Sequence, residues 1–371
     1  MSRKGEHAGT LADEGVNSLL LRVTCLFWLV AKLMGWRMFT TYRTFPTVAA
    51  FEWLNGTPSV IHTALFLITI FVVIALLLAG GNRHLLTVLL VAEVLLCLLD
   101  QNRWQPWEYQ YVFIILIFRV NVHRPRLIHA AIAFLLAFTY IYSGLGKLNE
   151  GFLVTTWNNA ILKHFLKVQA SSTSGLYYAG YFLGVTELLA GAGLLFSKSR
   201  RASAVILIVM HLFILLFLGP FGLRFNIIVW PWNVAMILYL YLVFIRRAND
   251  VTRFKALFAR WNLVVILCWA VLPAFNFMGY WDNYLSSNVY SGKIPKMIIC
   301  VSDTSKCRPL RRFLYASSSA KICAGEMKIN VQNWAMTETN VPVYPELRVY
   351  ETIQKTLRKQ YPLAGFSFVY Y

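Results

Sequence analysis

Charged residues are scarce in this 371-residue sequence, and acidic residues are the scarcest of them. Charged side chains make up 14% of the chain, with 16 Asp and Glu against 35 Lys and Arg. Hydrophobic residues make up 58%, and the mean hydropathy is +0.56. Because soluble globular domains carry about 25% charged residues, this deficit excludes an ordinary soluble domain and predicts a membrane protein.

The sequence also lacks the motifs of several common enzyme classes. It has no glycine-rich dinucleotide or phosphate loop, no HExxH zinc motif and no Ser/His/Asp ordering typical of a hydrolase. The seven histidines are scattered, which argues against paired haem ligands. ATP-driven and zinc chemistry are therefore disfavoured, and no metal is predicted.

What the sequence has instead is a series of long apolar runs. A helix needs roughly 20 apolar residues to cross a bilayer core, and nine segments approach this length, the fourth being the shortest. They lie near 19–36, 60–80, 84–100, 107–120, 127–147, 176–196, 202–218, 222–245 and 261–279. We therefore predict an all-α polytopic membrane bundle of about nine transmembrane helices, with the lipid bilayer as its first partner.

Composition divides the chain into three parts. Residues 1–18 are polar, residues 19–279 carry the apolar runs, and residues 280–371 are polar again. This division predicts an N-terminal tail, a transmembrane domain and a small C-terminal domain.

The basic residues predict how the helices are oriented. With nine spans and the N-terminus inside, the tail and the inner loops hold 14 Lys and Arg, and the opposite short loops hold seven. This excess is the positive-inside bias, and it predicts a cytoplasmic N-terminus and an extracytoplasmic C-terminus. Basic loops that face anionic lipid also account for the net charge of +19 without a nucleic-acid partner.

The C-terminal region has a mixed pattern that predicts a small α+β fold. Strand-like runs occupy Met297–Val301, 328–331 and 366–371, and a helical pattern occupies 345–359. In an oxidising compartment two of its three cysteines are expected to pair, and the sequence leaves the pair open. The three are Cys300, Cys307 and Cys323.

Ionisable residues inside the apolar runs are the first candidates for a site, because a charge within a membrane span is costly and by default functional. Glu93 and Glu187 lie in the middle of such runs, and His211 follows one. For each glutamate, an ion pair that only orients helices is an equally good hypothesis. For His211, a hydrogen-bonded helix contact is the simpler one.

Lys147 ends the apolar run that begins near Leu127, beside Gly144 and Gly146. A lysine at the rim of a span usually anchors the helix by extending to the interface. Here an amphipathic segment over 149–175 follows, which predicts an interfacial helix lying as a lid over Lys147. Lys147 is therefore either an anchor or a base.

A polar turn between the third and fourth runs is a further candidate. It contains Asp100 and Trp104, and it is expected on the same side of the membrane as Lys147. A tryptophan here is also typical of the interfacial belt, and Asp100 with Arg103 is also explained as an ordinary exposed pair. The alternative is a pocket built from this turn and Lys147.

Four segments occur in an order found in a known family. They are LDQNRW (99–104), YSGLGKLN (142–149), ELLAGAGLLF (187–196) and MHLF (210–213). The chain resembles the HTTM (horizontally transferred transmembrane) domain of vitamin K-dependent γ-carboxylases and their bacterial relatives, well over 90–245 and loosely over the rest of the membrane block. The resemblance also implies nine spans, a cytoplasmic N-terminus and an extracytoplasmic C-terminal part.

The resemblance implies a chemical role for Lys147. In the carboxylases a lysine of the corresponding segment deprotonates reduced vitamin K, and apolar surroundings favour the neutral amine that such a base requires. A reduced quinone is thus the implied cofactor, with carboxylase-like, or quinone-dependent lyase or oxidoreductase, activity. The candidate catalytic residues are Lys147, Glu187 and His211, and the candidate quinone contacts are Asp100, Trp104 and Tyr142, with Tyr140 as a further stacking partner.

Other functions stay open. The chain can instead be a non-catalytic subunit that binds a membrane redox partner, similar to the quinone-associated DoxX-type proteins. A transporter has less support, because no inverted repeat is visible, although Pro220 and Pro231 interrupt two apolar runs. The chain also departs from the carboxylases, which have a far larger C-terminal region and commonly Lys or Asp at the positions of Gly146 and Asn149.

Overall fold

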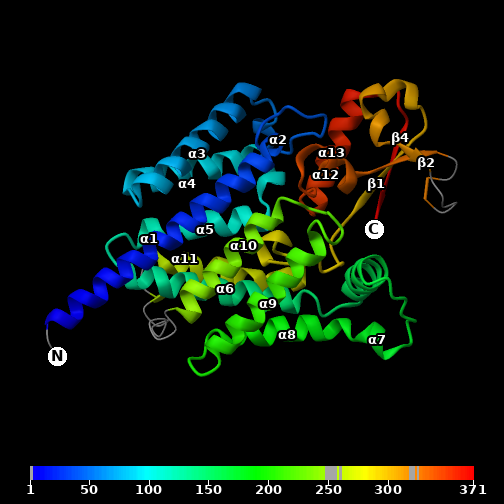
Figure 1. Ribbon diagram of the computed structural model, residues 1–371. Helices are drawn as coiled ribbons and strands as arrows, with labels where there is room; N and C mark the ends of the chain where they lie inside the picture. Colours follow the sequence, from blue (N-terminus) through cyan, green and yellow to red (C-terminus); the bar gives the residue numbers. More distant parts are fainter. Residues whose placement is uncertain (1–2, 247–256, 259–260, 317–321, 324–325) are drawn as a thin grey trace. The chain divides into compact units, whose positions relative to one another are not determined.

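The computed structural model describes residues 3–246, 257–258, 261–316, 322–323 and 326–371 (Figure 1). Four basic residues that entered the orientation prediction lie outside this part of the chain: Arg247, Arg253, Lys255 and Arg260. The chain forms two compact units. The first unit comprises residues 1–31, 68–92 and 106–293, and the second comprises residues 32–67, 93–105 and 294–371.

The first unit is helical. Its elements are α5 (Pro106–Val120), α6 (Pro125–Leu145), η3 (Phe152–Phe165), α7 (Gly175–Tyr178), α8 (Gly180–Gly193), α9 (Arg200–Leu218), α10 (Val229–Leu240), η4 (Tyr241–Ile245), α11 (Asn262–Ile266), η6 (Leu267–Val271), η7 (Leu272–Met278) and η8 (Tyr284–Ser286). Three long helices have residues in both units: α1 (Arg3–Met34), α3 (Ser59–Ala79) and α4 (Arg83–Leu99).

Each predicted apolar run coincides with helical structure, so the helical prediction is confirmed. Within the described residues, four helices are long and apolar enough to cross a membrane, as in an integral membrane protein. They are Gly15–Met34, Ser59–Ala79, Pro125–Leu145 and Arg200–Leu218. Only these four of the nine predicted spans meet that criterion, because the other helices are shorter, such as the 14-residue α8. Pro231 falls in the first turn of α10, where proline does not interrupt a helix.

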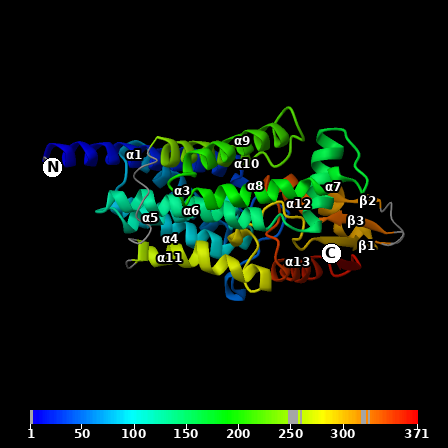
Figure 2. The same ribbon diagram turned by 90° about the horizontal axis from the view of Figure 1, so that it is seen from below.

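Glycines let α6 and α8 pack closely, and Figures 1 and 2 show these two helices side by side. A Cβ atom at Gly144 would lie 2.5 Å from the Leu188 backbone nitrogen, and one at Gly191 would lie 2.8 Å from Tyr140 Cβ. Small residues at such positions allow helix backbones to approach within a membrane. The close approach places the end of α6 against the middle of α8.

The second unit contains a small antiparallel sheet with the strand order β2-β3-β1-β4. Its strands are β1 (Met297–Val301), β2 (Tyr315–Ala316), β3 (Met327–Asn330) and β4 (Phe366–Tyr370), and its helices are α2 (Trp36–Phe39), η1 (Glu52–Leu54), η2 (Gln101–Arg103), η9 (Thr304–Phe313), α12 (Val331–Thr339) and α13 (Leu347–Gln360). The predicted α+β pattern is confirmed: three predicted strands and the predicted helix correspond to β1, β3, β4 and α13. Neither β2 nor α12 was predicted.

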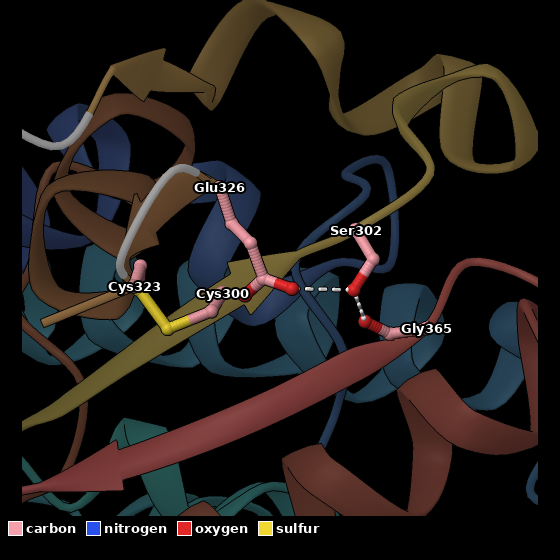
Figure 3. Close-up of a disulfide and its surroundings, with 5 residues drawn as sticks. All are labelled: Cys300, Ser302, Cys323, Glu326 and Gly365. Carbon is pink, nitrogen blue, oxygen red and sulfur yellow. Dashed lines mark hydrogen bonds between the residues drawn. A yellow bond between two sulfur atoms is a disulfide. The ribbon is translucent and has the colours of Figure 1, made fainter.

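A disulfide joins Cys300, on the central strand β1, to Cys323 (Figure 3). Beside it, the Ser302 hydroxyl hydrogen-bonds to Glu326 and to the Gly365 carbonyl, at 2.6 and 3.0 Å. Cys307 is the unpaired cysteine of the three and is buried. Burial, with a smaller effect of Asp303, raises the pKa of the Cys307 thiol, so the nucleophilic thiolate is disfavoured there.

Candidate functional site

A cavity of about 420 Å³ lies within the first unit. Its wall is built by α6, η3, α8, α9 and α10, together with the segment 287–290, and most of the lining side chains are apolar. The volume falls in the range of small-molecule sites, about 300–1,000 Å³. Polar side chains enter this apolar wall in a few places, and two of these form defined clusters.

The first cluster is centred on Lys147, in the turn directly after α6. Its Nζ atom lies 2.6 Å from Glu187 Oε2 on α8, and it donates a hydrogen bond of 2.6 Å to Ser143 Oγ. The side chains of Lys147 and Glu187 are 16% and 5% exposed. The lysine therefore points back along α6 into the cavity wall, where one carboxylate balances its charge.

The second cluster is a hydrogen-bonded chain across three helices. The Tyr140 hydroxyl on α6 lies 2.7 Å from His211 Nε2 on α9, and His211 Nδ1 lies 2.7 Å from Asn233 Oδ1 on α10. All three side chains are buried, and all three line the cavity. The cluster is neutral when the imidazole ring is neutral.

The segment 287–292 contributes Ser287, Val289 and Tyr290 to the cavity wall. Its backbone is unusual, since Ser287 and Tyr290 have positive φ values of 54° and 58°. The Tyr290 carbonyl accepts a hydrogen bond of 2.7 Å from Thr156 on η3, and its hydroxyl accepts one of 2.9 Å from Asn226. Burial raises the pKa of Tyr290 to about 12, although the bond from Asn226 opposes this, so the phenol stays neutral.

The amphipathic segment after Lys147 forms the helix η3. Its hydrogen-bond pattern is that of a π-helix. This form is rare in proteins, and where it occurs it is often found at a functional site. Phe152, Thr156 and Ile161 on one face line the cavity, whereas Lys163 and His164 are exposed. The segment thus covers part of the cavity, as a lid would.

The structure brings together three of the six candidate residues. Lys147, Glu187 and His211 line the same cavity. Tyr142 lies on α6, and its hydroxyl donates to the Ala270 carbonyl. Among the described residues that line the cavity, Asp100, Trp104 and Tyr142 do not occur.

Asp100 and Trp104 belong to the second unit. Asp100 pairs with Arg43, and it accepts hydrogen bonds from the backbone nitrogens of Val48 and Asn102, the second of which caps η2. The exposed pair suggested for Asp100 and Arg103 is wrong, because both are fully buried. The Arg103 guanidinium group forms hydrogen bonds to backbone carbonyls and to His62, so its hydrogen bonds are made within the protein rather than to solvent.

Some residues of the site were missed in the sequence. Asn233 is a polar residue within an apolar run, and the rule that singled out Glu187 applies to it as well. Ser143 precedes Lys147 by four residues and therefore lies on the same helix face. Tyr290 carries no such signal, because its place in the cavity depends on how the polar segment after the last helix folds back.

Comparisons with known proteins found no matching family model, no matching curated protein and no matching solved structure. Within the described part of the chain, no group of three or more His, Cys, Asp or Glu side chains is arranged to hold a metal ion. The cavity and its polar clusters are therefore the features of the molecule that bear on function.

Proposed function

We propose that this chain is an integral membrane enzyme of the HTTM class whose cavity binds a reduced quinone, with Lys147 as the proton acceptor. The proposal includes the nine-span topology with a cytoplasmic N-terminus and an extracytoplasmic C-terminus. One observation carries it: the Lys147–Glu187 ion pair lies in the wall of a mostly apolar cavity, rather than in solvent or in a packed core.

The lining suits a flat, apolar ligand that carries few polar groups. Phe152, Phe182, Phe213 and Phe217 provide aromatic surface, and Met210 provides a flexible apolar one. Most small-molecule sites have this composition, in which a small number of polar groups fixes the orientation of the ligand. A hydroquinone head group with an isoprenoid tail has the matching distribution of apolar surface and hydroxyl groups.

Lys147 can act as a base only as the neutral amine. As part of the proposal, Glu187 accepts the Lys147 proton across the 2.6 Å contact, which leaves the amine neutral. A bound hydroquinone would supply an acidic hydroxyl group within reach of Nζ. Lys147 then takes up that proton, and the hydrogen bond to Ser143 holds the resulting ammonium group in place.

The test is anaerobic titration of the detergent-purified full-length protein with a short-chain 1,4-naphthohydroquinone. Native mass spectrometry measures binding, and the red-shifted absorption of the phenolate measures proton transfer. We expect the wild-type protein to bind one ligand and to form phenolate, and Lys147→Met to bind without forming it. Absence of binding by the wild-type protein, or an equal phenolate band in Lys147→Met, contradicts the proposal.

Lys147→Arg distinguishes an enzyme from a non-catalytic quinone-binding subunit. Arginine keeps the positive charge but stays protonated, so it cannot serve as a base. An enzyme loses phenolate formation in this variant. A non-catalytic subunit tolerates the substitution, because it only binds quinone and a redox partner. Full function of Lys147→Arg, with co-purification of an oxidoreductase, would therefore replace the enzyme proposal with the subunit.

A further inference from the structure

The proposed role of Lys147 does not involve the second polar cluster of the cavity. Tyr140, His211 and Asn233 are hydrogen-bonded to one another, yet all three also border the cavity. A histidine that served only to join helices would need no access to a ligand-sized space. The position of the cluster in the cavity wall therefore points to a ligand contact.

The hydrogen bonds define which nitrogen of His211 carries the proton. Asn233 Nδ2 donates to the Val229 carbonyl at 2.8 Å, so the amide oxygen is the atom that faces His211. An amide oxygen only accepts hydrogen bonds, and Nδ1 must therefore carry the hydrogen. In the neutral ring Nε2 is then an acceptor, and the Tyr140 hydroxyl donates to it.

The Tyr140 oxygen, having donated its hydrogen, keeps its capacity to accept one. A ligand hydroxyl can thus donate to Tyr140 while Tyr140 donates to His211. Both hydrogen bonds form while His211 is neutral, so the cluster can bind this hydroxyl group without taking its proton.

The two clusters lie along one face of α6. Lys147 reaches back to Ser143, and three residues of helix separate Ser143 from Tyr140, which is about 4.5 Å along the axis. Two hydroxyl groups at opposite ends of one aromatic ring are separated by a distance of this order. A ring between the clusters can therefore address both.

We infer that Tyr140 and His211 form a second hydrogen-bonding pole of the cavity, which receives the second hydroxyl group of a para-dihydroxy aromatic ligand, and that Asn233 is the positioning residue that keeps His211 Nε2 free of hydrogen. The inference depends on the proposed function and makes it more specific. The cavity then selects a ligand with two free hydroxyl groups over a ligand with one.

The first experiment compares two ligands under anaerobic reducing conditions: a 1,4-naphthohydroquinone and its mono-O-methyl ether, which has lost one hydrogen-bond donor. We expect the wild-type protein to bind the dihydroxy ligand about tenfold more tightly, which is the effect of about one buried hydrogen bond. Tyr140→Phe should abolish this preference. Thr139→Val is the matched control, because Thr139 also lines the cavity but its hydroxyl donates to the Leu135 carbonyl at 2.9 Å.

The outcomes distinguish a failure of the proposed function from a failure of the second pole. A wild-type protein that binds neither ligand contradicts the proposed function and, with it, the second pole. A wild-type protein that binds both ligands with equal affinity contradicts the second pole alone. A preference that persists in Tyr140→Phe also contradicts the second pole, and a preference lost in Thr139→Val shows that it does not depend on Tyr140 specifically.

The second experiment tests Asn233 through the histidine ring itself. Nitrogen-15 NMR of histidine-labelled protein, with the signal assigned by His211→Gln, should show hydrogen on Nδ1 in the wild-type protein. Asn233→Leu should populate the other tautomer and weaken the ligand preference, and Asn233→Asp, which restores an acceptor, should recover both. Hydrogen on Nε2 in the wild-type protein would overturn the assignment, and so would an unchanged tautomer in Asn233→Leu.

Discussion

Each unit of the molecule contains a buried lysine–glutamate ion pair, and the two pairs differ in what surrounds them. In the second unit, Lys32 and Glu93 lie 2.8 Å apart and are both fully buried. In the first unit, Lys147 and Glu187 lie 2.6 Å apart and are 16% and 5% exposed. The residue types and the distances are nearly the same.

The surroundings give the two pairs different capabilities. The Lys32 ammonium group lies 3.8 Å from the centre of the Phe39 ring, so it packs against protein. Lys147 and Glu187 instead line a cavity with room for a ligand. The Lys147–Glu187 pair is therefore placed to contact a ligand, whereas the Lys32–Glu93 pair is enclosed by protein.

Loss of the lysine should affect activity most strongly at the pair that borders the cavity. Lys147→Met should lower proton transfer from the hydroquinone by about 10²- to 10⁴-fold, the usual contribution of a general base. The melting temperature should fall less than in Lys32→Met, because Glu187 borders a cavity whereas Glu93 is fully buried. Phenolate formation and thermal unfolding in detergent measure the two effects, and a large fall in melting temperature with activity retained would reverse the comparison.

The second effect separates the pairs by stability. Lys32→Met should lower the free energy of unfolding by about 3–5 kcal/mol, because it leaves the Glu93 carboxylate buried without its cation. The double variant Lys32→Met/Glu93→Leu should recover most of this loss, since apolar side chains can replace a buried ion pair. Equilibrium unfolding of the three proteins tests this, and a stable Lys32→Met would show that the pair is dispensable.

The disulfide extends the comparison to the second unit as a whole. Cys300 and Cys323 are 23 positions apart, and losing a cross-link over a loop of this size costs about 3 kcal/mol. Cys300→Ser should therefore lower the free energy of unfolding by about that amount and leave hydroquinone binding unchanged. Cys307→Ser is the control, because Cys307 forms no disulfide. Loss of binding in folded Cys300→Ser would show that the second unit contributes to the site.

The smallest effect concerns how the site is assembled. Gly144→Ala would place a methyl group 2.5 Å from the Leu188 backbone nitrogen, so α6 and α8 must move apart. We expect a loss of about 1–3 kcal/mol in the free energy of unfolding, typical of overpacking, and weaker proton transfer because Lys147 shifts away from Glu187. Gly175→Ala, whose new methyl group meets nothing within 4 Å, should change neither.

The candidate residues show which parts of the site can be predicted from the sequence. Polar groups within apolar runs identified Glu187 and His211, and the end of a run identified Lys147, because these signals are local. The same rule singled out Glu93, whose partner turned out to be Lys32. Asp100 and Trp104 were selected because their turn was expected on the same side of the membrane as Lys147, and they are not among the described residues that line the cavity.

The apolar helices, the helix α13 and the strands β1, β3 and β4 could be predicted from the sequence, and so could the apolar character that suits a membrane. Each of them has a hydropathy or a periodicity that is visible within its own segment. The folded structure was needed to show which lysine meets which glutamate, which two cysteines pair and that Tyr140, His211 and Asn233 form one chain. Such contacts join residues far apart in the sequence, and side-chain packing, such as that of α6 on α8 through Gly144 and Gly191, decides which of them meet.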